Sequence, residues 1–64
     1  MRLLIEELIE ASGLKNEYIA EKVGVDVRTL YKWRKGETMP RLDKAVKLAE
    51  VLDVEVMELY TLEK

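Results

Sequence analysis

Residues 16–35 read NEYIAEKVGVDVRTLYKWRK, and this stretch decides the fold. Two short helices that pack at a steep angle need a small residue for close approach and a glycine that can take a positive φ in the turn. Ala20 and Gly24 meet these two needs. Asp26 can cap the following helix through its carboxylate. The apolar positions of the stretch are Ile19, Val23, Val25, Leu30 and Trp33. The stretch therefore predicts two helices joined by a tight turn.

Helical spacing of apolar residues continues on both sides of this stretch. Gly13 and Gly36 are placed to end helices in the left-handed conformation. The helices are predicted at about residues 2–11, 16–23, 27–35, 42–52 and 55–61. The apolar stripe predicted for the fourth helix is Leu42, Ala45, Val46, Ala49 and Leu52. The sequence thus predicts an all-α fold of five helices around one core.

The composition limits what this chain can do. Its 64 residues fit one small domain, residues 1–64, with a thin core. It has no cysteine and no histidine, which excludes disulfides, the usual zinc sites and histidine-based catalysis. No nucleophile accompanies the acidic side chains, so we expect no enzymatic activity, no metal, no cofactor and no small-molecule ligand. Glu6 and Glu7 end the apolar start of the chain, so we expect no membrane span and a cytoplasmic protein.

Positive charge gathers in the middle of a chain whose net charge is −2. Residues 1–26 carry −3, residues 27–47 carry +5 and residues 48–64 carry −4. A local basic face matters more for phosphate binding than the total charge does. Two helices joined by a tight turn form a helix-turn-helix motif, here at about residues 16–35, and the second helix of such a motif commonly reads DNA. The charge pattern and the motif together favour double-stranded DNA as the partner over a merely solvated basic face.

The chain resembles the lambda-repressor-like (Cro/C1-type, XRE) helix-turn-helix domain over about residues 3 to 60. Each matching residue is a weak signal alone, but the ordered set at these spacings is specific. The matching residues are Gly13, Leu14, Ile19, Ala20, Val23, Gly24, Val25, Thr29, Leu30, Trp33, Gly36, Pro40, Leu48, Ala49, Leu52, Val54 and Leu59. The resemblance implies a small bacterial or phage transcriptional regulator associated with the nucleoid. It favours a repressor, although activators share the fold.

The resemblance also implies which residues meet DNA. Relatives usually begin the second helix with a glutamine that touches a phosphate, and Asn16 stands there. Arg28 can pair with guanine O6 and N7, and Val27 can pack on a thymine methyl. The implied base-reading residues are Val27, Arg28, Tyr31 and Lys32. The implied backbone contacts are Lys15, Asn16, Thr29, Arg34, Lys35 and Arg41. We expect Trp33 in the core rather than stacked on bases, because its spacing from Leu30 puts it on the apolar face. Tyr31 is equally compatible with an ordinary exposed tyrosine, and Lys44 and Lys47 are more consistent with solvated charges.

Two departures from the family pattern bear on the site. Relatives often pair an arginine late in the first helix with a glutamate near the end of the third, whereas this chain has Ile9 and Arg34 at those places. Arg34 is therefore free for phosphate, or it pairs with another acid such as Glu10. In the last helix, Met57 stands at a position that is commonly polar in relatives, and Tyr60 lies close by. Two large apolar side chains are therefore expected on a partly exposed helix.

An interface between two copies is expected at the last helix. Its residues are Met57, Leu59 and Tyr60, and the alternative is that they close the core. A homodimer would set two recognition helices about 34 Å apart and match a palindromic operator. Two other readings stay open from sequence. One is a protein-interaction module, such as an antirepressor, on the same scaffold. The other is an engineered or truncated DNA-binding domain.

Overall fold

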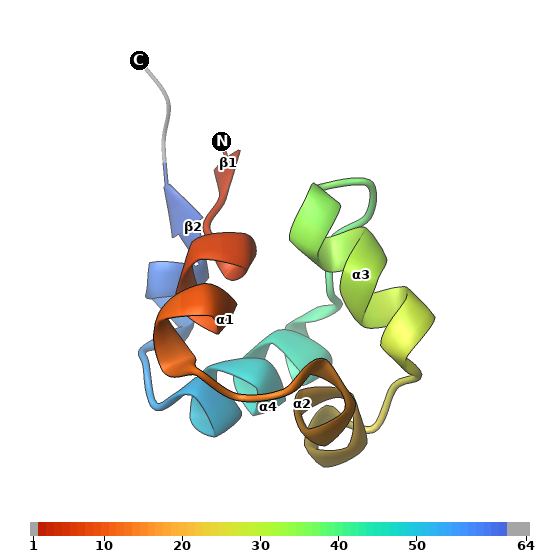
Figure 1. Ribbon diagram of the computed structural model, residues 1–64. Helices are drawn as coiled ribbons and strands as arrows, with labels where there is room; N and C mark the ends of the chain where they lie inside the picture. The colour runs from red at the N-terminus through yellow and green to blue at the C-terminus, as the bar shows by residue number, and fades with distance from the viewer. Residues whose placement is uncertain (1, 62–64) are drawn as a thin grey trace.

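An α-helix forms at each of the first four of the five predicted positions. The computed structural model describes the backbone of residues 2–61 and the side chains of residues 4–60. The all-α fold class is confirmed, and within this range the chain has four α-helices and one short 3-10 helix, η1. Figure 1 shows α1 on one side and α3 on the other, with α2 and α4 below them. The α-helices are α1 (Ile5–Ser12), α2 (Asn16–Val23), α3 (Val27–Lys35) and α4 (Leu42–Leu52).

The turn between α2 and α3 has the predicted construction. Gly24 takes φ +92°, a conformation that a side chain would strain. The backbone N–H groups of Gly24 and Val25 both donate to the carbonyl of Ala20, at 2.9 and 3.0 Å, and so close the end of α2. The Asp26 carboxylate accepts from the backbone N–H of Thr29 at 2.9 Å and so caps α3. These local bonds fix the direction in which α3 leaves the turn.

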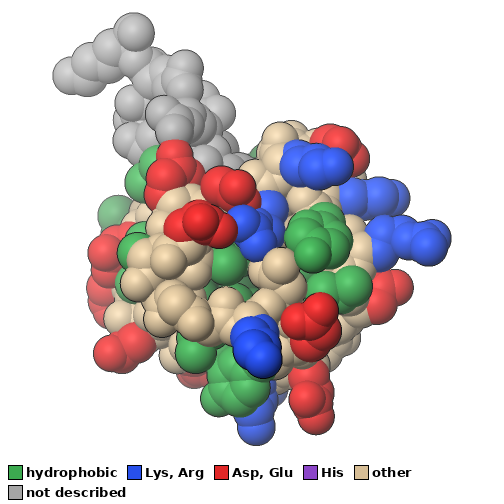
Figure 2. Space-filling view, in the orientation of Figure 1, with side chains coloured by type: hydrophobic (Ala, Val, Ile, Leu, Met, Phe, Trp, Pro, Cys, Tyr) green, Lys and Arg blue, Asp and Glu red, His purple; other side chains and the backbone are tan. Residues whose placement is uncertain are grey.

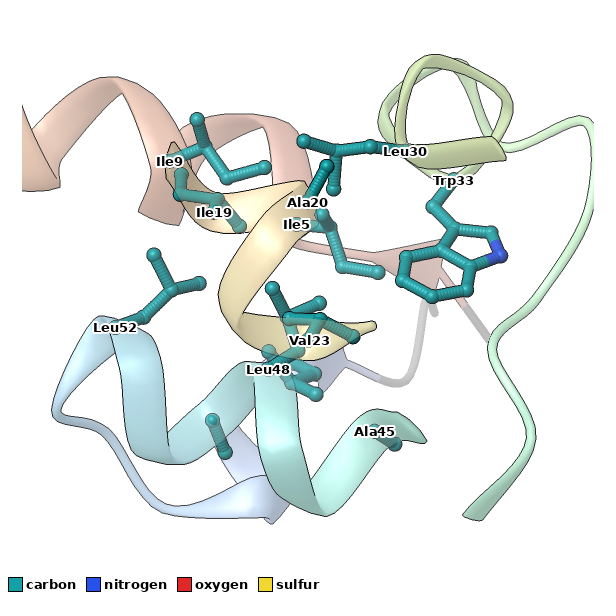
Figure 3. Close-up of a cluster of buried hydrophobic side chains, with 12 residues drawn as sticks. Ile5, Ile9, Ile19, Ala20, Val23, Leu30, Trp33, Ala45, Leu48 and Leu52 are labelled. Carbon is teal, nitrogen blue, oxygen red and sulfur yellow. The ribbon is translucent and has the colours of Figure 1, made fainter. Parts of the chain in front are cut away.

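The core draws side chains from every helix (Figure 3). Trp33 is buried, as predicted, and Figure 3 shows its indole projecting from α3 into the cluster together with Leu30. No polar or charged residue of the described chain is buried. The fold therefore depends on apolar burial. The core residues are Ile5, Ile9, Ile19, Ala20, Val23, Leu30, Trp33, Ala45, Leu48, Ala49, Leu52 and Leu59.

The predicted stripe of α4 is wrong at two positions. Leu42 is 75% exposed and Val46 is 41% exposed. The buried face of α4 consists of Ala45, Leu48, Ala49 and Leu52, and it contacts α2 and η1. Leu42 and Val46 lie to one side of that face, because apolar spacing alone cannot say where the covered arc of a helix ends.

The two ends of the chain also differ from the prediction. Residues Arg2–Leu3 form a strand, β1, rather than the start of α1. The predicted last helix is the 3-10 helix η1 (Val56–Leu59), followed by a strand, β2 (Tyr60–Thr61). The two strands pair antiparallel, with Arg2 opposite Thr61, and lie side by side in Figure 1. At both ends, backbone N–H and C=O groups expected to form helical hydrogen bonds instead pair between the two strands. The periodicity of apolar residues within a segment does not reveal such a long-range pairing.

The predicted interface at the last helix needs one correction. Leu59 is fully buried in the core, so it closes the core rather than facing a second copy. Its carbonyl also accepts from the Leu4 backbone N–H at 2.7 Å. Met57 is 81% exposed and Tyr60 is half-buried. Among the described side chains of η1 and β2, Met57 is thus fully on the surface and Tyr60 is partly so.

The burial difference within α4 gives a matched stability test. Leu48→Ala should lower the free energy of unfolding by about 2–5 kcal/mol, because it leaves a cavity in the core. Leu42→Ala removes the same atoms from an exposed side chain and should change that free energy by less than about 0.5 kcal/mol. Urea unfolding followed by the fluorescence of Trp33 measures both variants. Equal losses would contradict the placement of Leu42 on the surface.

Candidate nucleic-acid interface

The outer face of α3 brings four of the predicted site residues together. Arg28, Tyr31, Lys32 and Lys35 are spaced at i, i+3, i+4 and i+7, so they share one side of the helix. All four are exposed, and with Glu37 they line a shallow concavity of about 430 Å³. Figure 2 shows Lys and Arg side chains gathered on the side where α3 lies, while acidic side chains dominate the opposite side. We call these four residues the α3 outer face.

The cap of α3 places the first base-reading candidates. The Asp26 carboxylate holds the first turn through the backbone N–H of Thr29, and this hydrogen bond keeps the pKa of Asp26 below its ordinary value. The positive charges of Arg28 and Lys32 lower it further. Asp26 therefore stays ionised at neutral pH, and its carboxylate keeps the capping hydrogen bond that holds the turn carrying Val27 and Arg28.

Arg34 is engaged with three side chains. Its Nε donates to Glu6, its Nη2 donates to Glu10 at 2.7 Å and its Nη1 donates to Asn16 at 2.7 Å. Pairing with an acid such as Glu10, one of the two alternatives from sequence, is therefore observed. The hydrogen bond from Arg34 lowers the pKa of Glu6, and the same bond raises the pKa of Arg34. The ion pairs join α1 to α3, with the acids on α1 and the arginine on α3, which reverses the arrangement expected from the family pattern.

Sequence reasoning missed Glu6 as a partner of Arg34. Glu6 and Glu10 are four residues apart on α1, so they lie one turn apart on the same face. That spacing opposite an arginine was the signal that could have found the double ion pair. Helical spacing within the first helix does not give its register against the third helix, so the sequence alone could not say which acids face Arg34.

Asn16 joins the start of α2 to α3. Its amide nitrogen donates to the Tyr31 hydroxyl at 3.2 Å, across the turn of the motif. Asn16 also lines a second concavity of about 330 Å³, together with Lys15 and Arg34. The predicted backbone contacts Lys15 and Asn16 thus lie at one end of α2, next to the α3 outer face.

Three predicted contacts lie away from these groups. Val27 is half-buried and packs against the core, so only part of its side chain can reach a base. Thr29 is half-buried as well. Arg41 is exposed at the start of α4, outside both concavities.

The site offers hydrogen-bond donors and positive charge. Within the described part of the chain, no cluster of acidic side chains could hold a metal ion. Residues 2–61 contain no helix long and apolar enough to span a membrane. Arginine, lysine, tyrosine and asparagine donors on one face are the groups that contact phosphates and base edges.

Comparisons with known proteins agree with this geometry. The model of a helix-turn-helix family matches residues 5–59. A Haemophilus influenzae protein described as an uncharacterized HTH-type transcriptional regulator is 40% identical over 57 residues. The match covers 89% of this chain and 23% of that protein, so the chain spans under a quarter of the relative's length. No solved structure matches the chain.

The stability of the fold should depend on pH through Asp26 and Glu6. Both carboxyls have a folded pKa below their ordinary values of 3.8 and 4.5. Their contribution is therefore complete above those values and is lost as the pH falls through the lower folded pKa. We expect the thermal midpoint to fall between about pH 5 and pH 2. Asp26→Asn keeps a capping oxygen but cannot titrate, so its midpoint should fall less steeply over the same range. Parallel curves for the two proteins would contradict a titrating cap.

Proposed function

The chain belongs to the XRE-type helix-turn-helix family, and we propose that it is a sequence-specific transcriptional regulator that reads the major groove of double-stranded DNA with α3. The observation that carries this proposal is the α3 outer face. Its three cations and one tyrosine stand on the second helix of the motif, opposite the buried Leu30 and Trp33. The major groove of B-DNA is wide enough to admit an α-helix presented in this way.

Base reading is assigned to the first turns of α3. Arg28 would donate to O6 and N7 of one guanine, which is worth about 1–3 kcal/mol of discrimination. Lys32, one turn later on the same face, would reach a neighbouring guanine or a phosphate. The exposed part of Val27 would pack on a thymine methyl. Tyr31 was predicted from sequence as a fourth base reader, and its hydroxyl oxygen accepts a hydrogen bond from Asn16.

Backbone contacts are assigned to the periphery of the same surface. Lys15 and Asn16 would meet phosphates at the start of α2, where the N–H groups of the helix also favour an anion. Thr29 and Lys35 would meet them along α3, and Arg41 would do so at the start of α4. Arg34 could join them only by giving up a bond to Glu6, Glu10 or Asn16. These contacts would set the register of α3 without reading sequence.

A homodimer is the assembly that this proposal favours on DNA. A single domain with a few cations binds weakly at physiological salt, and a second copy adds contacts on one duplex. The exposed Met57 gives each copy an apolar residue at the end away from α3. The expected operator is a palindrome with half-sites about one helical turn apart. We propose repression because a dimer bound across a promoter blocks it without any further surface. The expected location is the nucleoid.

Selection from a pool of random duplexes tests the base-reading assignment. The unchanged chain should select one symmetric sequence. Arg28→Ala should weaken binding to that sequence about 5- to 150-fold, because it loses a bidentate contact with guanine. On unselected duplex the same variant should lose only about one phosphate's worth of salt dependence. Lys22→Ala, a lysine of α2 outside the proposed contacts, is the matched control and should bind the selected duplex nearly as the unchanged chain does.

The same titration separates DNA binding from the protein-interaction alternative. Phosphate-driven binding weakens steeply as salt rises from about 50 to about 200 mM. If no duplex is selected, and none binds in a salt-dependent way, the proposed function fails and the surface around Met57 becomes the place to look for a protein partner.

A further inference from the structure

A chain of hydrogen bonds runs from Arg34 through Asn16 to Tyr31 and ends at the molecular surface. Arg34 Nη1 donates to Asn16 Oδ1, and Asn16 Nδ2 donates to the Tyr31 hydroxyl oxygen. Arginine has no acceptor atom, so Asn16 must turn its amide oxygen toward Arg34 and its NH₂ group toward Tyr31. The direction of every bond in the chain is therefore fixed by the chemistry of its first member.

Two donors are left over at the end of this chain. The Tyr31 oxygen accepts from Asn16, so its own O–H points elsewhere, and among the described residues nothing accepts it. The second hydrogen of the Asn16 NH₂ group also lacks an acceptor there. Tyr31 is 43% exposed, so these donors reach solvent. Two neighbouring donors suit a ligand that presents several acceptor oxygens, as a phosphate does.

Charge argues against Arg34 itself as the phosphate ligand. Glu6 and Glu10 both pair with its guanidinium, so the group of three carries a net charge of −1. The Arg34 side chain is only 13% exposed, whereas both carboxylates are largely exposed. A phosphate that approached Arg34 would meet the two carboxylates first. Arg34 can act on a DNA ligand through Asn16 instead.

We propose that the Tyr31 hydroxyl donates to a phosphate oxygen of the DNA backbone, in a unit that Asn16 completes and Arg34 holds in place. The inference rests on the proposed DNA binding and replaces the base-reading role for Tyr31. Tyr31 lines the concavity of the α3 outer face, and its partner Asn16 lines the concavity at the start of α2. Tyr31 therefore lies at the border between the proposed base contacts of α3 and the proposed backbone contacts at the start of α2. Arg34 is a positioning residue that orients the amide of Asn16.

Tyr31→Phe tests the hydroxyl. It should weaken binding by about three- to tenfold, the worth of one hydrogen bond, on a random-sequence duplex and on the selected operator alike. The preferred bases should not change. Tyr18→Phe is the matched control: Tyr18 is 47% exposed on α2, and its ring, over which Lys22 lies, is kept in the variant. A loss seen on the operator alone, with altered base preference, would make Tyr31 a base reader and overturn the inference. So would the absence of any loss, or an equal loss in Tyr18→Phe.

Arg34→Lys tests the positioning role. Lysine keeps the positive charge but lacks the planar fork that serves three acceptors at once. Asn16 is then no longer oriented, so adding Tyr31→Phe to Arg34→Lys should weaken binding less than about twofold further. A residue that only stabilised the fold would leave the cost of Tyr31→Phe unchanged. Fully additive losses, with both proteins folded by circular dichroism, would overturn this part.

Ethylation interference on the operator locates the contact. Ethylation of one phosphate in each half-site should block binding of the unchanged chain. Ethylation of that same phosphate should not affect binding of Tyr31→Phe. An identical interference pattern for the two proteins would overturn the inference and leave the proposed function standing. Failure of the unchanged chain to bind any duplex would overturn both.

Discussion

Leu30 and Trp33 anchor α3 to the core, and the placement of the outer surface depends on that burial. The two side chains are three residues apart, so they fix the rotation of α3 about its axis. The opposite side of α3 therefore faces solvent. It carries the cations and the tyrosine of the α3 outer face. The Asp26 cap and the Gly24 turn then set where this helix starts. The recognition surface is thus a by-product of apolar packing on the other side of the same helix.

Electrostatics divides the molecule in the same way. The basic residues gather over α3, while the acidic residues lie mainly on α1, α2 and the C-terminal end (Figure 2). The acids would repel a polyanion, so they restrict the orientation in which DNA can approach and make binding sensitive to salt. Arg34 marks the boundary between the two zones. It neutralises part of the charge of Glu6 and Glu10, and it links that acidic edge to Asn16.

The helix-turn-helix could be predicted because its signals are local. Ala20, Gly24 and Asp26 specify a turn within a few residues, and the structure confirms each of them. The pairing of Arg2–Leu3 with Tyr60–Thr61 could not be predicted, since it joins residues nearly the whole chain apart. The exposure of Leu42 depends on how far α2 and η1 reach around α4. The bonds of Asn16 depend on the packing of α2 against α3. Such features depend on contacts between segments far apart in the sequence. The hydrogen bonds of the candidate site are among them.

We propose that DNA meets one surface, made from the α3 outer face and the start of α2. An NMR titration of the ¹⁵N-labelled chain with duplex DNA at low ionic strength tests it most directly. Amide chemical shifts should change along α3 and in the first turn of α2, and those on the acidic face of α1 should stay unchanged. Changes confined to η1 around Met57, or no change at all, would contradict it.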